Sequence, residues 1–100
     1  MPFNFPFFLH FKGGLSNLLL GNVVITKSPD SCPLVGKITE ECMEEAGFNN
    51  GEYQDVCTDY DQLDIILQHK AIAGVSFTGS SRSGAIIASK AGQYLKRTVM

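Results

Sequence analysis

One hundred residues are enough for one small domain at most. Hydrophobic residues make up 44% of the chain, enough for a buried core, whereas charged residues make up only 18%. Ordinary soluble domains have about 25% charged residues, so we expect a sparsely charged surface or one partly covered by further protein. A formal net charge of −2 argues against binding to nucleic acid or to an anionic membrane.

Residues 1–21 are rich in Phe and Leu, but their pattern is not that of a membrane span. His10, Lys12 and a pair of glycines interrupt it, and no apolar run approaches about 18 residues. A basic leading region and a small-residue cleavage pattern are also missing, so a secretion signal is not expected. We expect a buried helix after Pro6, and any part of it left exposed would favour association.

The cysteines are Cys32, Cys42 and Cys57, an odd count without C-x-x-C spacing. This pattern argues against a disulfide framework and against a zinc or other metal site. We expect free, mostly buried thiols in a reducing compartment.

Strand and helix signals alternate along the rest of the chain. Strands are predicted over 23–26, 53–58, 72–77 and from 97 onward, with helices over about 31–46, from 59, and over 81–94. Gly47 fits the position just after a helix, and Asp59 and Asp61 fit a helix start. The alternation predicts βαβ units with a parallel sheet and right-handed crossovers. The apolar faces expected to be buried comprise Leu34, Val35, Ile38, Cys42 and Ala46, then Leu63, Ile65, Ile66 and Leu67, then Ile86, Ile87, Ala91, Tyr94 and Leu95.

The segment 72–92 is the most informative part of the chain, because it predicts a strand, a turn of small residues and a helix. Such a turn presents backbone N–H groups at a helix N-terminus to an anion, and Gly79 and Gly84 would let phosphates approach the backbone. The Lys-Ser/Thr pair of a Walker A loop is absent, as is the G-x-G-x-x-G fingerprint. Two interpretations remain open: a nucleotide or other phosphate site, or an ordinary turn in which Ser80 or Ser81 caps the helix.

Several short motifs along the chain point to one family. They are P-F-N-F-P at 2–6, G-N-V-V-I-T-K at 21–27, E-A-G-F at 45–48, F-T-G-S-S-R-S-G at 77–84 and A-G-Q-Y-L-K-R-T-V at 91–99. In this order and at these separations they resemble the aldehyde dehydrogenase family over essentially the whole chain. The closing pattern is most similar to the branch that includes succinate-semialdehyde dehydrogenases.

The resemblance implies an α/β fold, a Rossmann-like three-layer arrangement of a partial parallel sheet with flanking helices. Residues 1–100 would form part of an NAD(P)-binding domain. The implied enzyme is an oxidoreductase that oxidises an aldehyde, such as a semialdehyde, to a carboxylic acid while hydride passes to NAD(P)⁺. It would act on a small molecule as a homo-oligomer, in the cytoplasm, or in mitochondria if the true N-terminus lies upstream.

The resemblance also implies roles for individual residues near the start of the chain. Asn4 would donate its side-chain N–H to the oxyanion that forms on the substrate, although the local sequence alone favours a turn or a helix cap. Pro2 and Phe3 would line the cofactor site, Phe3 standing where Trp is commoner. Lys27 would bind the adenosine ribose, the local alternative being a solvated lysine at a strand end.

Cofactor choice depends on the residues after this lysine. Asp30 would accept a hydrogen bond from a ribose 2′-hydroxyl and repel a 2′-phosphate, which favours NAD over NADP, whereas the small Ser28 could accommodate a phosphate. Ser80 matches the serine that touches the pyrophosphate, between the matching Gly79 and Gly84. Arg82 could help to balance the phosphate charge or face solvent.

The sequence also departs from the family. Where many relatives have a Gly-rich loop, residues 57–61 read C-T-D-Y-D, which puts the cofactor contacts of that loop in doubt. None of the three cysteines matches the family nucleophile, and the general-base glutamate belongs to an E-L-G-G motif expected just after Met100. With the oligomerisation segment also unmatched, we expect the isolated chain to be inactive. The alternatives are a vestigial or regulatory nucleotide-binding module and a non-functional fragment.

Overall fold

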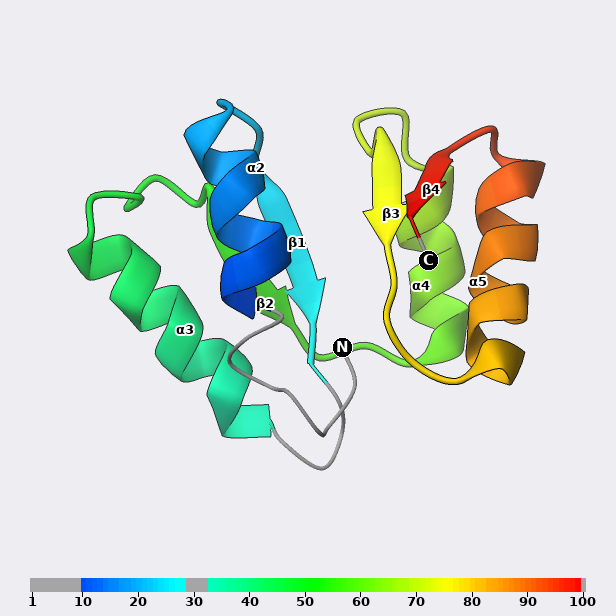
Figure 1. Cartoon of the computed structure of the whole chain (residues 1–100), viewed down its shortest axis with the longest axis horizontal. Helices are drawn as coiled ribbons and strands as arrows, with labels where there is room; N and C mark the ends of the chain where they lie inside the picture. The colour runs from blue at the N-terminus through cyan, green and yellow to red at the C-terminus, as the bar shows by residue number, and fades with distance from the viewer. Residues whose placement is uncertain (1–9, 29–32, 100) are drawn as a thin grey trace. The chain divides into compact units, whose positions relative to one another are not determined.

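The computed structural model describes residues 10–28 and 33–99, which form two compact units divided between Cys57 and Thr58 (Figure 1). Each unit contains two parallel strands and the helices that accompany them. The α/β class and the parallel pairing expected from the sequence are confirmed. Among the described residues, no helix is long and apolar enough to cross a membrane.

The first unit is built around a βαβ motif. A π-helical segment, η1 (His10–Leu15), continues into α2 (Ser16–Leu19), and β1 (Val24–Lys27), α3 (Pro33–Glu45) and β2 (Tyr53–Val56) follow. The two strands pair in parallel, Val24 opposite Tyr53 and Lys27 opposite Val56. The strand order therefore places Lys27 at the carboxyl end of the sheet, as expected.

Tyr53 is the centre of this unit's apolar core. It is 1% exposed and packs with Leu18 of α2 and Met43 of α3. A Cβ added to Gly14 would lie 2.6 Å from the Tyr53 ring, so this glycine lets η1 lie directly on the sheet. Of the leucines between residues 10 and 20, Leu18 is buried, whereas Leu19 and Leu20 are exposed, so the part of the expected helix that the structure describes is buried along one side.

The buried side of α3 differs from the predicted one. Thr39 and Met43 face the core, whereas Leu34 is 71% exposed and Ile38 is also exposed. Thr39 can be buried because its hydroxyl donates to the Val35 carbonyl oxygen at 2.8 Å. The rotation of the helix is set by what fits against the polar side chains of the sheet, and the count of apolar residues alone could not reveal that.

The exposed side of α3 also carries one of the cysteines. Cys42 is exposed there, and Cys57, just after β2, is exposed as well. The expectation of mostly buried thiols is wrong for these two, while Cys32 lies outside the described residues. Gly47 ends the helix as predicted, with φ of 113° and a hydrogen bond from the Phe48 N–H to the Met43 carbonyl oxygen.

Side chains of α3 also hold the backbone of β2. Glu40 accepts a hydrogen bond from the Asp55 N–H at 3.0 Å, and the Lys37 ammonium donates to the Asp55 carbonyl oxygen at 3.1 Å. Lys37 and Glu40 form an ion pair at 3.4 Å. The crossover helix is thereby fixed to the strand that follows it.

The second unit contains α4 (Tyr60–Gln68), β3 (Gly74–Ser76), α5 (Ser81–Gln93) and β4 (Arg97–Val99). The strands pair in parallel, Gly74 opposite Arg97, and a hydrogen bond from the Phe77 N–H to the Val99 carbonyl oxygen continues the pairing. Asp59 caps α4 and forms a capping box with Gln62, so the predicted acidic helix start is confirmed.

The core of this unit is formed by Leu67 of α4 with Ile87 and Ala91 of α5. Ile65, Ile86 and Leu95 were predicted to be buried and are exposed. For Ile86 the reason is geometric, because it lies next to the buried Ile87 and a helix turns by about 100° per residue. Leu95 lies beyond the end of α5.

Candidate functional site: the turn before helix α5

The turn from Phe77 to Ser80 links the end of β3 to the start of α5. Ser80 is the N-cap of the helix, with extended backbone angles (φ −67°, ψ 153°). Its Oγ accepts a hydrogen bond from the Ser83 N–H at 3.2 Å, and its carbonyl oxygen accepts one from the Gly84 N–H at 2.9 Å. Of the two candidate caps in the sequence, Ser80 therefore takes the role and Ser81 does not.

Capping leaves part of the helix terminus available. The first four N–H groups of an α-helix have no partner within the helix, and the Ser80 cap satisfies the one on Ser83. The amides of Ser81 and Arg82 therefore lie at the positive end of the helix dipole without an intrahelical acceptor. This end of α5 can accept an anionic group.

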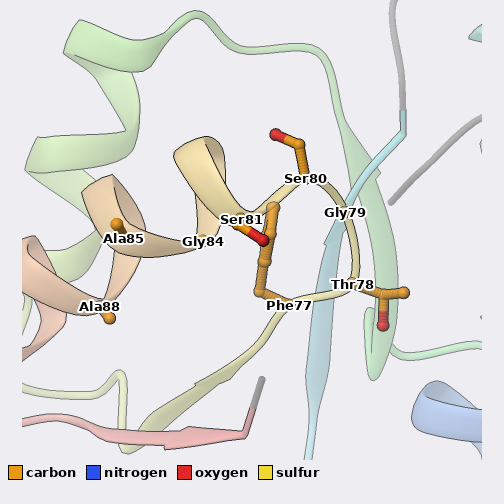
Figure 2. Close-up of a pocket in the computed structure, with 8 residues that line it drawn as sticks. All are labelled: Phe77, Thr78, Gly79, Ser80, Ser81, Gly84, Ala85 and Ala88. Atoms are coloured by element: carbon orange, nitrogen blue, oxygen red, sulfur yellow. The ribbon is translucent and has the colours of Figure 1, made fainter.

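A pocket of about 460 Å³ opens at this turn (Figure 2). Small side chains form much of its wall and make the space available, and none of its lining residues is acidic. The lining residues are Phe77, Thr78, Gly79, Ser80, Ser81, Gly84, Ala85 and Ala88. Apolar walls beside free helix N-terminal amides suit a ligand that combines an apolar part with a phosphate.

Gly79 is required by the shape of this turn. A Cβ at this position would lie 2.6 Å from Cζ of the Phe77 ring. The ring therefore lies close against the Gly79 backbone and forms one wall of the pocket (Figure 2). A larger residue at 79 would displace the ring.

The structure brings together three of the site residues expected from the sequence, namely Gly79, Ser80 and Gly84, in one pocket. Lys27 ends β1 in the first unit and is half-buried. Arg82 is exposed. Pro2, Phe3, Asn4 and Asp30 lie outside the described residues.

The pocket also contains residues that the sequence reasoning missed, namely Phe77, Thr78, Ser81, Ala85 and Ala88. The spacing of Gly84 and Ala88, four residues apart on one helix face, was a usable signal for a small-residue wall. Cys42 and Cys57 are not among the lining residues. Within 10–28 and 33–99 no group of three His, Cys, Asp or Glu side chains could hold a metal ion.

Comparison with known proteins gives the family of this fold and site. The model of the aldehyde dehydrogenase family matches residues 1–100, so the chain belongs to that family. A succinate-semialdehyde dehydrogenase [NADP(+)] of Deinococcus radiodurans is 33% identical over 99 residues, which are 99% of this chain and 21% of that protein. Succinate semialdehyde dehydrogenase [NAD(P)+] Sad of Escherichia coli is 31% identical, over 100% of this chain and 22% of that protein.

Solved structures agree. The succinic semialdehyde dehydrogenase of Streptococcus pyogenes, crystallised with NADP⁺ as the cofactor, superposes with a TM-score of 0.92 and 36% identity, over 95% of this chain and 21% of that one. These relatives agree with the branch expected from the closing motif. The chain spans about a fifth of the length of the relatives it matches.

Proposed function

We propose that this chain supplies part of the nucleotide-binding layer of an NAD(P)-dependent aldehyde dehydrogenase, which oxidises an aldehyde to a carboxylic acid. The observation that carries the proposal is the pocket at the N-terminus of α5, lined by Gly79, Ser80 and Gly84, in a chain of this family. Two relatives are named for succinate semialdehyde, which supports a semialdehyde as the substrate.

The pyrophosphate of the cofactor would lie at the turn before α5. Ser80 and the backbone N–H groups of Ser81 and Arg82 would bind the negatively charged pyrophosphate, because the helix dipole and N–H groups without an intrahelical acceptor favour an anion there. Gly79 and Gly84 would permit close approach. When bound, the nicotinamide supplies the hydride acceptor for the oxidation.

The other proposed roles belong to the first part of the chain. Lys27, at the carboxyl end of β1, would bind the adenosine ribose, in keeping with ligand binding at the carboxyl ends of parallel strands. Asn4 would stabilise the substrate oxyanion, and Pro2, Phe3 and Asp30 would contribute to the cofactor site.

We further propose a preference for NAD over NADP, although one solved relative holds NADP⁺. Asp30 would repel a 2′-phosphate. The alternative phosphate partner, Ser28, is buried and its hydroxyl donates to Asp55 at 2.8 Å, which supports the same choice. Parallel titrations with NAD⁺ and NADP⁺ would test the preference.

The isolated chain is proposed to bind the cofactor without oxidising aldehydes. None of its cysteines matches the family nucleophile, and Cys42 and Cys57 do not line the pocket. An assay of NADH or NADPH formation with semialdehydes should read zero, and turnover that survives mutation of all three cysteines would refute the assignment.

Cofactor binding without turnover would also fit a regulatory module, and genomic sequence that continues in frame into E-L-G-G would exclude that alternative. We propose a cytoplasmic, homo-oligomeric parent enzyme.

Ser80 offers a sharp test of the pyrophosphate site. Asn and Asp cap helices about as well as Ser, so Ser80→Asn and Ser80→Asp should unfold at nearly the same temperature as the parent. The aspartate puts a negative charge beside the proposed phosphate, so we expect Ser80→Asp to weaken NAD⁺ binding about tenfold or more relative to Ser80→Asn. Equal affinity of the two variants for NAD⁺ would exclude a phosphate at this turn.

A further inference from the structure

The carboxyl end of β1 is tied to β2 by a buried carboxylate. Thr26 and Ser28 each donate a hydroxyl hydrogen bond to the same oxygen, Oδ1 of Asp55, and both bonds are 2.8 Å long. All three residues are buried. We call this arrangement the Asp55 clamp. The separation along the sequence is 29 positions between Thr26 and Asp55 and 27 positions between Ser28 and Asp55.

The Asp55 side chain has little freedom to move. A Cβ added to Gly36, in the first turn of α3, would overlap with the Asp55 carboxyl group. The backbone N–H and carbonyl oxygen of Asp55 are held by Glu40 and Lys37 of the same helix. The acceptor of the clamp is therefore fixed by its surroundings before any ligand binds.

Lys27 lies between the two residues that the clamp holds. Successive side chains of a strand point to opposite faces, so hydroxyls at 26 and 28 that meet one oxygen place Lys27 on the other face. A strand end would ordinarily be free to fray. Two buried hydrogen bonds, one on each side of Lys27, fix the backbone at this position.

We propose that Asp55 is a positioning residue for Lys27. The proposal rests on the proposed function, in which Lys27 binds the adenosine ribose of NAD(P). A lysine side chain is long and flexible, so holding its backbone and its face reduces the entropy lost when the ribose binds. Asp55 itself touches no cofactor and acts through Thr26 and Ser28.

The test compares variants of the 1–100 chain that remove the acceptor or the donors. Asp55→Ala removes the acceptor, and Thr26→Val with Ser28→Ala removes both donors while leaving Asp55 in place. Asp55→Asn keeps a carbonyl oxygen in the same position and should restore the parent behaviour. Thr39→Val is the matched control, because it also deletes one buried hydroxyl of this unit but none that meets Asp55.

The first readout needs no ligand. Amide hydrogen exchange at Thr26 and Val56, whose N–H groups lie on the ladder between β1 and β2, should become about tenfold faster in the donor double variant, as expected for the loss of two hydrogen bonds. Thr39→Val and Asp55→Asn should leave it within about twofold of the parent. Unchanged exchange at these two amides in the donor double variant would overturn the clamp, even if Asp55→Ala fails to fold.

The second readout is NAD⁺ affinity in a double-mutant cycle with Lys27→Met. The donor double variant should weaken NAD⁺ binding about fivefold in the parent and less than about twofold in the Lys27→Met background. Equal losses in both backgrounds would mean that the clamp does not act through Lys27, and would overturn the proposal. If Lys27→Met leaves NAD⁺ binding unchanged, the ribose role of Lys27 fails and with it the positioning proposal, while the exchange data still show whether the clamp holds the strand.

Discussion

Tyr53 shows how a single buried residue carries both packing and pH sensitivity. Its ring fills the space over Gly14 and packs with Leu18 and Met43. Burial raises the pKa of Tyr53 from 10.0 to about 12, with smaller contributions from the nearby carboxylates of Asp55 and Glu40. The folded state therefore favours the protonated phenol.

Alkaline unfolding should reveal this residue. Because the folded pKa is above the unfolded one, the stabilisation is complete below pH 10 and is lost as the pH rises from 10 towards 12. The loss is at most about 3 kcal/mol, from a difference of two pKa units. Tyr53→Phe should flatten the dependence of the free energy of unfolding on pH in this range, measured by urea denaturation. An unchanged slope in Tyr53→Phe would contradict the assignment.

The residue scale also shows where sequence reasoning reached its limit. The roles expected for Gly79, Ser80 and Gly84 followed from local motifs, and the structure does place these residues around one pocket. The Asp55 clamp could not be predicted, because it joins residues from two strands and depends on their register. An aspartate within a strand indicated a buried polar contact at Asp55, but the sequence did not predict which residues would donate to it.

At the scale of elements, the ends of helices α3 and α5 make an instructive pair. Both helices end with the same pair of backbone hydrogen bonds. In each, the N–H of a residue in the left-handed conformation and the N–H of the residue after it donate to carbonyl oxygens in the last turns of the helix. In α3 the left-handed position is Gly47, whereas in α5 it is Leu95, with φ of 57°. A left-handed conformation costs a residue with a Cβ about 1–2 kcal/mol.

Leu95→Gly should therefore stabilise the chain. The Leu95 side chain is 92% exposed, so its removal sacrifices little packing. After allowing for the greater entropy of glycine in the unfolded chain, we expect a gain of about 0.5–1 kcal/mol. Thermal denaturation measures the gain. Leu95→Ala serves as the control, since it also removes the side chain but keeps the Cβ, and an equal gain in Leu95→Ala would contradict this explanation.

Helices α4 and α5 are joined by a polar contact centred on Asp64. Lys90 forms an ion pair with Asp64 at 3.0 Å, and Tyr94 and Gln68 each donate to its carboxylate at 3.1 Å. The hydrogen bond from Lys90, followed by those from Gln68 and Tyr94, lowers the pKa of Asp64 below its usual value of 3.8.

Acid denaturation should be sensitive to this contact. Because the folded pKa is lowered, the stabilisation is present above pH 3.8 and is lost as the pH falls below it. Asp64→Asn should reduce the steepness of the acid transition below pH 3.8, followed by circular dichroism. A parent-like acid transition in Asp64→Asn would show that the contact does not survive in solution.

The type and order of the elements were predictable from the sequence, whereas the buried faces of helices were not. Alternating apolar and turn signals identified the strands and the helices α3, α4 and α5. The face of α3 was wrong because Gly36 and Thr39, weakly apolar residues, fit the sheet better than Leu34 and Ile38. Side-chain shape and hydrogen bonding determine which face of α3 is buried, and hydrophobic periodicity predicts neither of them.

At the scale of the whole molecule, many large apolar side chains of the described residues are exposed. Large side chains that are exposed include Leu19, Leu20, Ile25, Leu34, Ile38, Ile65, Ile86, Leu95 and Val99. The chain spans about a fifth of the length of the relatives it matches, and in those relatives further chain is available to cover the corresponding surface. Alone, the chain should associate at high concentration.

Polar substitutions on the exposed side of α3 should reduce this association. Leu34→Gln with Ile38→Gln should lower the average mass measured by sedimentation at high concentration, while the free energy of unfolding changes by less than about 0.5 kcal/mol. Met43→Leu, a conservative change in the core, should leave the mass unchanged. A parent chain that sediments as a monomer at every concentration would refute the expectation.

The two side chains that hold the Asp55 backbone have a consequence for polymerisation. Because the Val24 N–H donates to the Glu52 carbonyl oxygen, alternate residues of β2 bond to β1, and Asp55 turns its amide and carbonyl the other way. Glu40 and Lys37 already occupy those two groups with a carboxylate and an ammonium. A strand from another molecule that paired with this edge of β2 would have to displace both charged side chains. We therefore expect this edge to resist the strand pairing that leads to fibrils.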